Sequence, residues 1–215
     1  APPAYGVLKT EFRRSGGYGR KFVEAGYREW GGKMQASVPD ATRWALPQGM
    51  ADPSRICIWG GSYGGYAALM GAIQEPDMYR CVIAASAVTD VNLMWKWGDT
   101  HRSQYGLSFL DSQVGDDPKH LREVSPVAHA GEIKAALFLV HGVRDERVSY
   151  EHAKAMRDAL DKAGKKYEGW FPRNETHGIH GDENREEYYE RVLKFLDANI
   201  GDPGAAASGP ASGTG

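Results

Sequence analysis

The sequence predicts an α/β fold, in which a mostly parallel sheet carries helices on both faces. Two observations predict it. Short apolar runs alternate with longer amphipathic stretches, and the first clear run, Ile56 to Trp59, ends at a glycine cluster before an Ala/Leu/Met-rich run. The 215 residues, of which 41% are hydrophobic and 25% charged, suit one domain with a sizeable core. In such folds the functional groups gather beyond the carboxyl ends of the strands.

The chain before this run predicts a strand, a loop and a helix. Tyr5 to Leu8 is the strand candidate, and the glycine-rich stretch 12–19 is a loop. Residues 27–45 have a helical pattern except at Pro39, where a proline inside a helix costs about 3 kcal/mol. We therefore expect a helix that begins near Ser37 or is kinked at Pro39.

Two buried strands with a helix between them come next. The strand at 56–59 leads into a helix around 67–73, and the apolar run 80–87 forms the second strand. Cys57 and Cys81 lie inside these strands. We expect them to be buried free thiols, which say little about the redox compartment.

The second half of the chain predicts a cover followed by two further strands. Residues 88–130 are irregular, with room for two short helices, and an insertion of this kind normally covers a site. The remaining elements are expected as a strand at 135–141, a helix at 149–163, a strand at 167–171, a loop at 172–184 and an amphipathic helix at 185–199. The domain therefore spans residues 1–200, and the Gly/Ala/Ser/Pro tail 201–215 is expected to be disordered.

A candidate nucleophile stands between the 56–59 strand and its helix. Gly60-Gly61-Ser62-Tyr63-Gly64 is a G-x-S-x-G pattern, and a nucleophile elbow needs small residues beside its serine because the chain turns so sharply there. The turn would hold the Ser62 hydroxyl above the sheet edge. The backbone N–H of Tyr63, at a helix N-terminus, would face developing negative charge.

A serine nucleophile needs a base to take its proton, and the base needs a carboxylate to fix its tautomer. Asp145 comes just after the 135–141 strand, and His177 comes just after the 167–171 strand. Both are therefore predicted at the same sheet edge as Ser62. The chain order Ser, Asp, His is that of α/β-hydrolases.

Several residues compete for these roles. His180 lies in the same loop as His177, and Glu146 and the pair Asp116-Asp117 are alternatives to Asp145. His141 is nearer its strand than its loop and is interpreted as structural. A metal site made from His177, His180, Asp182 and Glu183 is a further alternative, although the spacing is not a strong metal pattern.

The remaining composition argues against several classes of partner. A net charge of −2 gives no reason to expect nucleic acid or an anionic membrane, and no apolar run approaches the roughly 20 residues that span a bilayer. We expect no cofactor and no metal. No signal peptide is visible at Ala1-Pro2-Pro3-Ala4, which slightly favours the cytoplasm.

These motifs resemble the catalytic domain of the prolyl oligopeptidase family of serine peptidases, in particular its acylaminoacyl-peptidase and dipeptidyl-peptidase-like members. The resemblance runs from about Tyr5 to Ile200. It is carried by FRRSGGYG at 12–19, AGYREWGGKMQ at 25–35, ADPSRICIWGGSYGGY at 51–66, VSP at 124–126, His141-Gly142 with Asp145, and THG at 176–178. It implies Ser62 as nucleophile, Asp145 and His177 as its partners and the Tyr63 N–H as an oxyanion donor. Arg14, Pro39 and Ala136 depart from the family pattern, away from these residues.

The resemblance also implies that parts of the enzyme are missing. Family members carry a β-propeller that limits entry to short peptides, and nothing here resembles one. The first strands, and the loop that usually supplies the second oxyanion donor, should precede Tyr5. One absent strand would lie between the Tyr5 and Ile56 strands. We therefore expect a fragment of a longer enzyme, with the Tyr5 strand unpaired or moved and with an open sheet edge that invites self-association, so that a homo-oligomer is possible.

The expected reaction is hydrolysis of short or acylated peptides through an acyl-enzyme. Two alternatives stay open. One is an esterase or other acyl hydrolase that uses the same three residues, and the other is a non-catalytic fragment.

Overall fold

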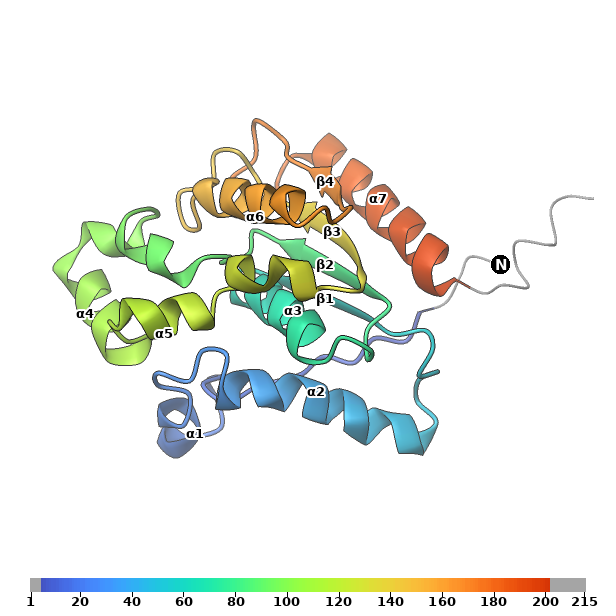
Figure 1. The fold of residues 1–215 in the computed structure, drawn as a ribbon, viewed down its shortest axis with the longest axis horizontal. Coiled ribbons are helices and arrows are strands. Elements are labelled where there is room, and N and C mark those ends of the chain that lie inside the picture. Colours follow the sequence, from blue (N-terminus) through green and yellow to red (C-terminus); the bar gives the residue numbers. More distant parts are fainter. Residues whose placement is uncertain (1–4, 202–215) are drawn as a thin grey trace, which may run out of the picture.

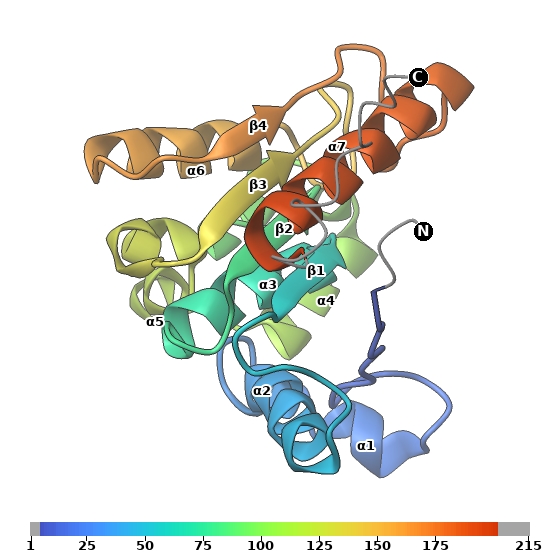
Figure 2. The ribbon, with the colours of Figure 1, turned by 90° about the vertical axis from the view of Figure 1, so that its right-hand side faces the viewer.

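The computed structural model describes residues 5–201 and contains one four-stranded parallel sheet (Figures 1 and 2). The strands are β1 (Cys57–Gly61), β2 (Cys81–Ala85), β3 (Ala136–Val140) and β4 (Glu168–Trp170), and they lie side by side in that order. The helices are α1 (Arg20–Glu24), α2 (Lys33–Ala45), α3 (Tyr63–Gln74), α4 (Gln104–Gln113), α5 (Pro118–Glu123), α6 (Glu151–Lys162) and α7 (Asp182–Ile200). Four 3-10 turns are η1 (Leu46–Gln48), η2 (Val91–Trp95), η3 (Thr100–Arg102) and η4 (Pro126–Glu132).

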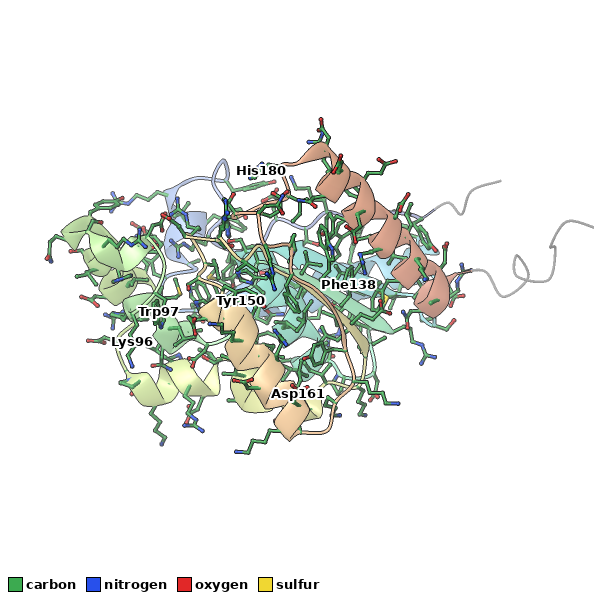
Figure 3. The ribbon with its side chains drawn as sticks, turned by 90° about the horizontal axis from the view of Figure 1, so that it is seen from above. Lys96, Trp97, Phe138, Tyr150, Asp161 and His180 are labelled. Atoms are coloured by element: carbon green, nitrogen blue, oxygen red, sulfur yellow. A yellow bond between two sulfur atoms is a disulfide. The ribbon has the colours of Figure 1, made fainter. Side chains whose placement is uncertain are left out.

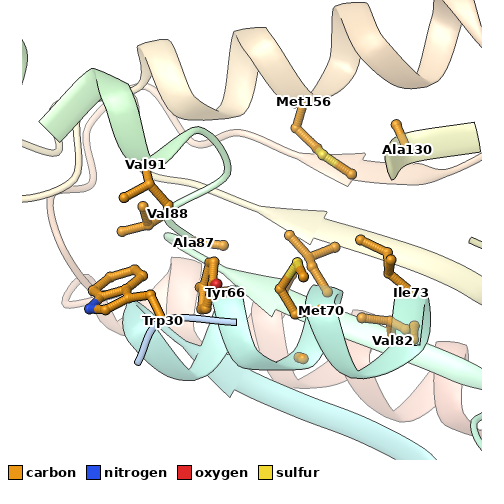
Figure 4. Close-up of a cluster of buried hydrophobic side chains, with 14 of the residues drawn as sticks. Trp30, Tyr66, Met70, Ile73, Val82, Ala87, Val88, Val91, Ala130 and Met156 are labelled. Atoms are coloured by element: carbon orange, nitrogen blue, oxygen red, sulfur yellow. The ribbon is translucent and has the colours of Figure 1, made fainter. Parts of the chain in front are cut away.

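Helices cover both faces of the sheet, which confirms the predicted fold class. Alternate residues of a strand point to opposite faces, and the two cores follow this alternation. Val82 and Leu139 pack with α2, α3, α6 and the cover on one face, whereas Ile83 and Phe138 pack with α7 on the other. Side chains from α3, α6 and β2 converge between the layers in the larger core (Figure 4).

The register of the strands places three loops at one edge. Gly61 lies opposite Ala85, Ala85 opposite Val140, and Val140 opposite Trp170. Because all four strands are parallel, the segments that follow β1, β3 and β4 leave from the same edge. These are the segments that carry Ser62, Asp145 and His177.

Two expectations for the N-terminal part need correction. Residues 5–8 form no strand: Val7 is 90% exposed, and no described strand lies beside β1 on its outer edge to pair with them. The segment is thus unpaired, which was one of the two stated outcomes. Helix α2 begins at Lys33 rather than at Tyr27 or Ser37, after turns through 27–32, and it contains Pro39 in its interior.

The expectation of free thiols was wrong. Cys57 and Cys81 face each other across β1 and β2, with their Cα atoms 4.6 Å apart, and they form a disulfide. This separation lies within the range that a disulfide spans. The pairing depends on the register of two strands, which the spacing of the cysteines along the chain does not reveal.

The C-terminal expectations hold more closely. The cover 88–130 contains two α-helices, α4 and α5, as expected, with 3-10 turns around them. Helix α7 begins at Asp182, three residues before the predicted 185. Apart from Gly201, the tail predicted at 201–215 lies outside the described residues, as do residues 1–4. None of the helices described is both long and apolar enough to cross a membrane.

Candidate active site

Ser62 stands at a strained turn between β1 and α3. Its φ is 56° and its ψ is −122°, a conformation that side-chain-bearing residues rarely adopt. The turn requires glycine beside it, since a Cβ on Gly60 would overlap the backbone of Gly64. The backbone N–H of Ser62 donates a hydrogen bond to the carbonyl of Ala85 at 2.9 Å, which connects the turn to β2. The local sequence therefore forms the predicted strand–turn–helix elbow.

The N-terminus of α3 lies directly behind this serine. Tyr63 is the first residue of the helix, so its backbone N–H has no partner within the helix. The helix dipole adds partial positive charge at the same place. Such an N–H is suited to donate a hydrogen bond to a bound oxygen that gains negative charge.

Asp145 is buried in the turn that follows β3. Its Oδ1 accepts hydrogen bonds from the backbone N–H groups of Arg147 and Val148, each at 2.9 Å. Its Oδ2 lies 2.8 Å from Nδ1 of His177 and 3.3 Å from Nε2 of His141. Burial by itself raises the pKa of this carboxyl, but the bonds from His141, His177 and Val148 outweigh that effect and hold the pKa well below its usual range. Asp145 is thus an anion that points at His177.

His177 lies in the loop between β4 and α7, and its side chain is 30% exposed. Figure 3 shows the neighbouring His180 at the same loop, just before α7. Because Asp145 is an anion, it fixes the His177 proton on Nδ1 and leaves Nε2 as the acceptor. Within residues 5–201 no hydrogen bond joins His177 to the Ser62 hydroxyl. The structure therefore brings Asp145 and His177 into contact, and the pairing of His177 with Ser62 stays a prediction.

The competing residues make other contacts. His180 donates its backbone N–H to Glu175, and Glu146 lies 3.4 Å from Arg102 on the surface. Asp117 caps α5 through its side chain. Among the residues that the structure describes, no group of three or more His, Cys, Asp or Glu side chains is arranged to hold a metal ion.

Two buried side chains lie beside the site: sequence reasoning gave His141 only a structural role and did not consider Glu175. His141, interpreted as structural, is 3% exposed and contacts Asp145, and its Nε2 lies 2.7 Å from the Val148 carbonyl. Glu175 is also 3% exposed and bonds within the loop of His177. Its place two residues before a candidate histidine was the only available signal.

Known proteins are similar to this chain over nearly its whole length. A family model described as "Prolyl oligopeptidase family" matches residues 4–203. Dipeptidyl aminopeptidase BIII of Pseudoxanthomonas mexicana is 31% identical over 202 residues, which is 92% of this chain and 29% of that protein.

Solved structures are similar to the chain in fold. A puromycin-hydrolyzing peptidase of Mycobacterium tuberculosis superposes with a TM-score of 0.81 at 24% identity, over 88% of this chain and 29% of that one. Porphyromonas gingivalis dipeptidyl peptidase 4 superposes with a TM-score of 0.73 at 27% identity, over 88% of this chain and 26% of that one. The chain thus spans less than a third of the length of these proteins.

Proposed function

Since this chain belongs to the prolyl oligopeptidase family of serine peptidases and has their α/β-hydrolase fold, we propose that it cleaves peptide bonds with Ser62, His177 and Asp145. The observation that supports the proposal most is the 2.8 Å contact between Asp145 and His177, beyond the same sheet edge as a serine with a positive φ. These are the parts of a hydrolase triad in its usual chain order.

In the proposed reaction, Ser62 Oγ attacks the carbonyl carbon of the scissile peptide bond while His177 Nε2 takes its proton. Asp145 stabilises the imidazolium that forms. The carbonyl oxygen becomes an oxyanion and accepts a hydrogen bond from the Tyr63 N–H. The tetrahedral intermediate then expels the amine, which receives the proton from His177, and leaves an ester on Ser62. Water, deprotonated by His177, hydrolyses this ester and restores the serine.

The substrate class is a proposal drawn from relatives. The similar proteins include one named as a dipeptidyl aminopeptidase and acylaminoacyl peptidases. We expect short peptides with a free or acylated N-terminus, and we expect the longer parent to carry the β-propeller that excludes larger ones. Because the chain spans only 29% of the length of dipeptidyl aminopeptidase BIII, the activity of the chain by itself is a separate question for experiment.

A fluorophosphonate probe tests the proposal directly, because it reacts with activated serines. We expect labelling of the wild-type chain at Ser62 and none in Ser62→Ala. Among substrates, we expect cleavage of dipeptidyl or acyl-aminoacyl amides in addition to simple esters.

The alternatives predict different results. Ester cleavage without amide cleavage would favour the esterase. A folded wild-type chain that the probe does not label would favour the non-catalytic fragment.

A further inference from the structure

Glu175 is a buried carboxylate that the proposed reaction does not use. It lies two residues before His177 and is 3% exposed. In the described part of the chain no lysine or arginine forms an ion pair with it. A buried anion without a cation must be satisfied by other donors, so the identity of these donors reveals what it holds together.

The donors all come after His177 in the chain, whereas Glu175 comes before it. The backbone N–H groups of His180 and Gly181 bond to its two oxygens at 2.8 and 3.0 Å, and the side-chain amide of Asn184 bonds at 2.6 Å. Burial raises the pKa of this carboxyl, but these hydrogen bonds outweigh burial and the pKa is lowered. The Glu175 carboxylate therefore bonds to the far end of the loop 175–181 and to the first turn of α7.

The backbone of the same loop is hydrogen-bonded to the turn that carries Asp145. The carbonyl of Glu175 accepts the N–H of Arg144 at 2.9 Å, and the carbonyl of Pro172 accepts the N–H of Val143 at 3.0 Å. A Cβ on Gly142 would overlap the carbonyls of residues 175 and 176, so the loop lies directly against the turn of Asp145. Glu175 thus joins the Asp145 turn, through its backbone, to the start of α7, through its side chain.

We propose that Glu175 is a positioning residue for His177, which holds Nδ1 of that histidine within 2.8 Å of Asp145. His177 sits between the two attachments on a partly exposed loop, with no strand or helix of its own to fix it. A misplacement of about 1 Å in such a group costs on the order of 100-fold in rate. The inference rests on the proposed function, because the position of His177 matters only if it is the base.

Glu175→Gln is the principal test, since it keeps the volume but places an amide group against one of the two backbone N–H donors. Asn174→Ala is the matched control: Asn174 also bonds to the Asn184 amide, at 3.1 Å, but not to the backbone of the loop. We expect Glu175→Gln to lower the rate of fluorophosphonate labelling about 10- to 100-fold. Asn174→Ala should label at the wild-type rate.

A second measurement does not depend on the serine. The proton between His177 Nδ1 and Asp145 gives a downfield NMR signal, and its exchange with water reports how firmly the pair is held. Glu175→Gln should speed this exchange and Asn174→Ala should not, while circular dichroism shows both variants to be folded. Wild-type labelling and wild-type exchange in a folded Glu175→Gln would overturn the proposal.

The outcomes separate this inference from the proposed function. A wild-type chain that is not labelled at Ser62 contradicts the proposed function, while the exchange rate still tests the role of Glu175. If Glu175→Gln does not fold, Asn184→Ala decides, because it removes one donor and leaves the backbone bonds. Faster exchange than in Asn174→Ala supports the proposal, and equal exchange overturns it.

Discussion

The two halves of the candidate site are held in place by different forces. On the nucleophile side the constraint is steric: Gly60 lies against the backbone of Gly64, Gly65 has the Cβ of Ala87 2.8 Å from where its own Cβ would be, and Ser62 has a positive φ. On the acid–base side it is hydrogen bonding: Asp145 accepts two backbone N–H groups and contacts two histidines. The steric constraint depends on the absence of side chains at these glycines. The hydrogen-bonded arrangement depends on the presence of every donor and acceptor.

The hydrogen-bonded side should lose the most activity from a single atom change. Asp145→Asn places an amide opposite Nδ1 of His177, which favours the tautomer with its proton on Nε2 and removes the base. We predict a fall of about 10⁴ in the rate of probe labelling with the fold retained. Glu146→Gln, which changes the neighbouring exposed carboxylate, should label normally. A labelled Asp145→Asn beside an inactive Glu146→Gln would reassign the carboxylate.

Substitutions on the nucleophile side should instead lower the stability of the fold. In Gly60→Ala the new methyl group would overlap the carbonyl of Gly64, and backbone at the end of β1 must move. We predict a loss of at least about 4 kcal/mol in the free energy of unfolding, measured with urea. Gly64→Ala is the control from the same motif, because its Cβ would meet nothing within 4 Å, and we expect unchanged or slightly higher stability. Equal stability of the two variants would contradict the steric account.

The acid–base side should also make the stability of the protein depend on pH. His152 of α6 lies behind His141, and burial together with the nearby His141 lowers its pKa to about 3, while Asp145 acts the other way. The unfolded chain binds this proton below pH 6.5 and the folded chain does not, so stability is full above pH 6.5 and falls as the pH drops toward 3. Asp145, whose pKa is also lowered, adds a loss only below about pH 4.

Between pH 7 and pH 4.5 we therefore predict that His152 accounts for a loss of about 3 kcal/mol of unfolding free energy. His152→Gln removes the titrating group and should flatten the curve in this range, whatever its effect at pH 7. Urea unfolding at several pH values measures both proteins. An equally steep curve for the variant would show that other groups cause the loss.

The same contrast explains which features the sequence predicts. The steric elbow can be predicted because glycines at fixed offsets from Ser62 are visible in the chain, and the strand ends locate Asp145 and His177 at one edge. The role of Glu175 could not be predicted, since its donors follow from how the 172–181 loop folds back on α7. The start of α7 at Asp182 was missed for the same reason.

Features that need a neighbouring strand were also out of reach. The Cys57–Cys81 disulfide depends on the register of β1 and β2. Residues 5–8 have the composition of a strand, but a strand forms only when its backbone groups find partners, and the outer edge of β1 has no neighbour among the described residues. Local pattern therefore predicts the strands of this sheet, including its edge strands β1 and β4, but it does not predict features that depend on which segment lies beside a strand.

His141 gives the smallest expected effect and tests how far the bonded side extends. Its Nε2 must carry a proton, because the carbonyl of Val148 at 2.7 Å only accepts, and the same N–H is shared with Asp145 at 3.3 Å. His141→Gln keeps a donor that can reach both oxygens, whereas His141→Leu keeps the volume and removes the donor. Hydrogen bonds to charged groups contribute about 1.5 kcal/mol or more, so we predict about 10-fold slower probe labelling for the leucine variant. The glutamine variant should stay within about threefold of wild type. Equal rates for both variants would mean that His141 only fills space beside Asp145, as its place in the sequence suggested.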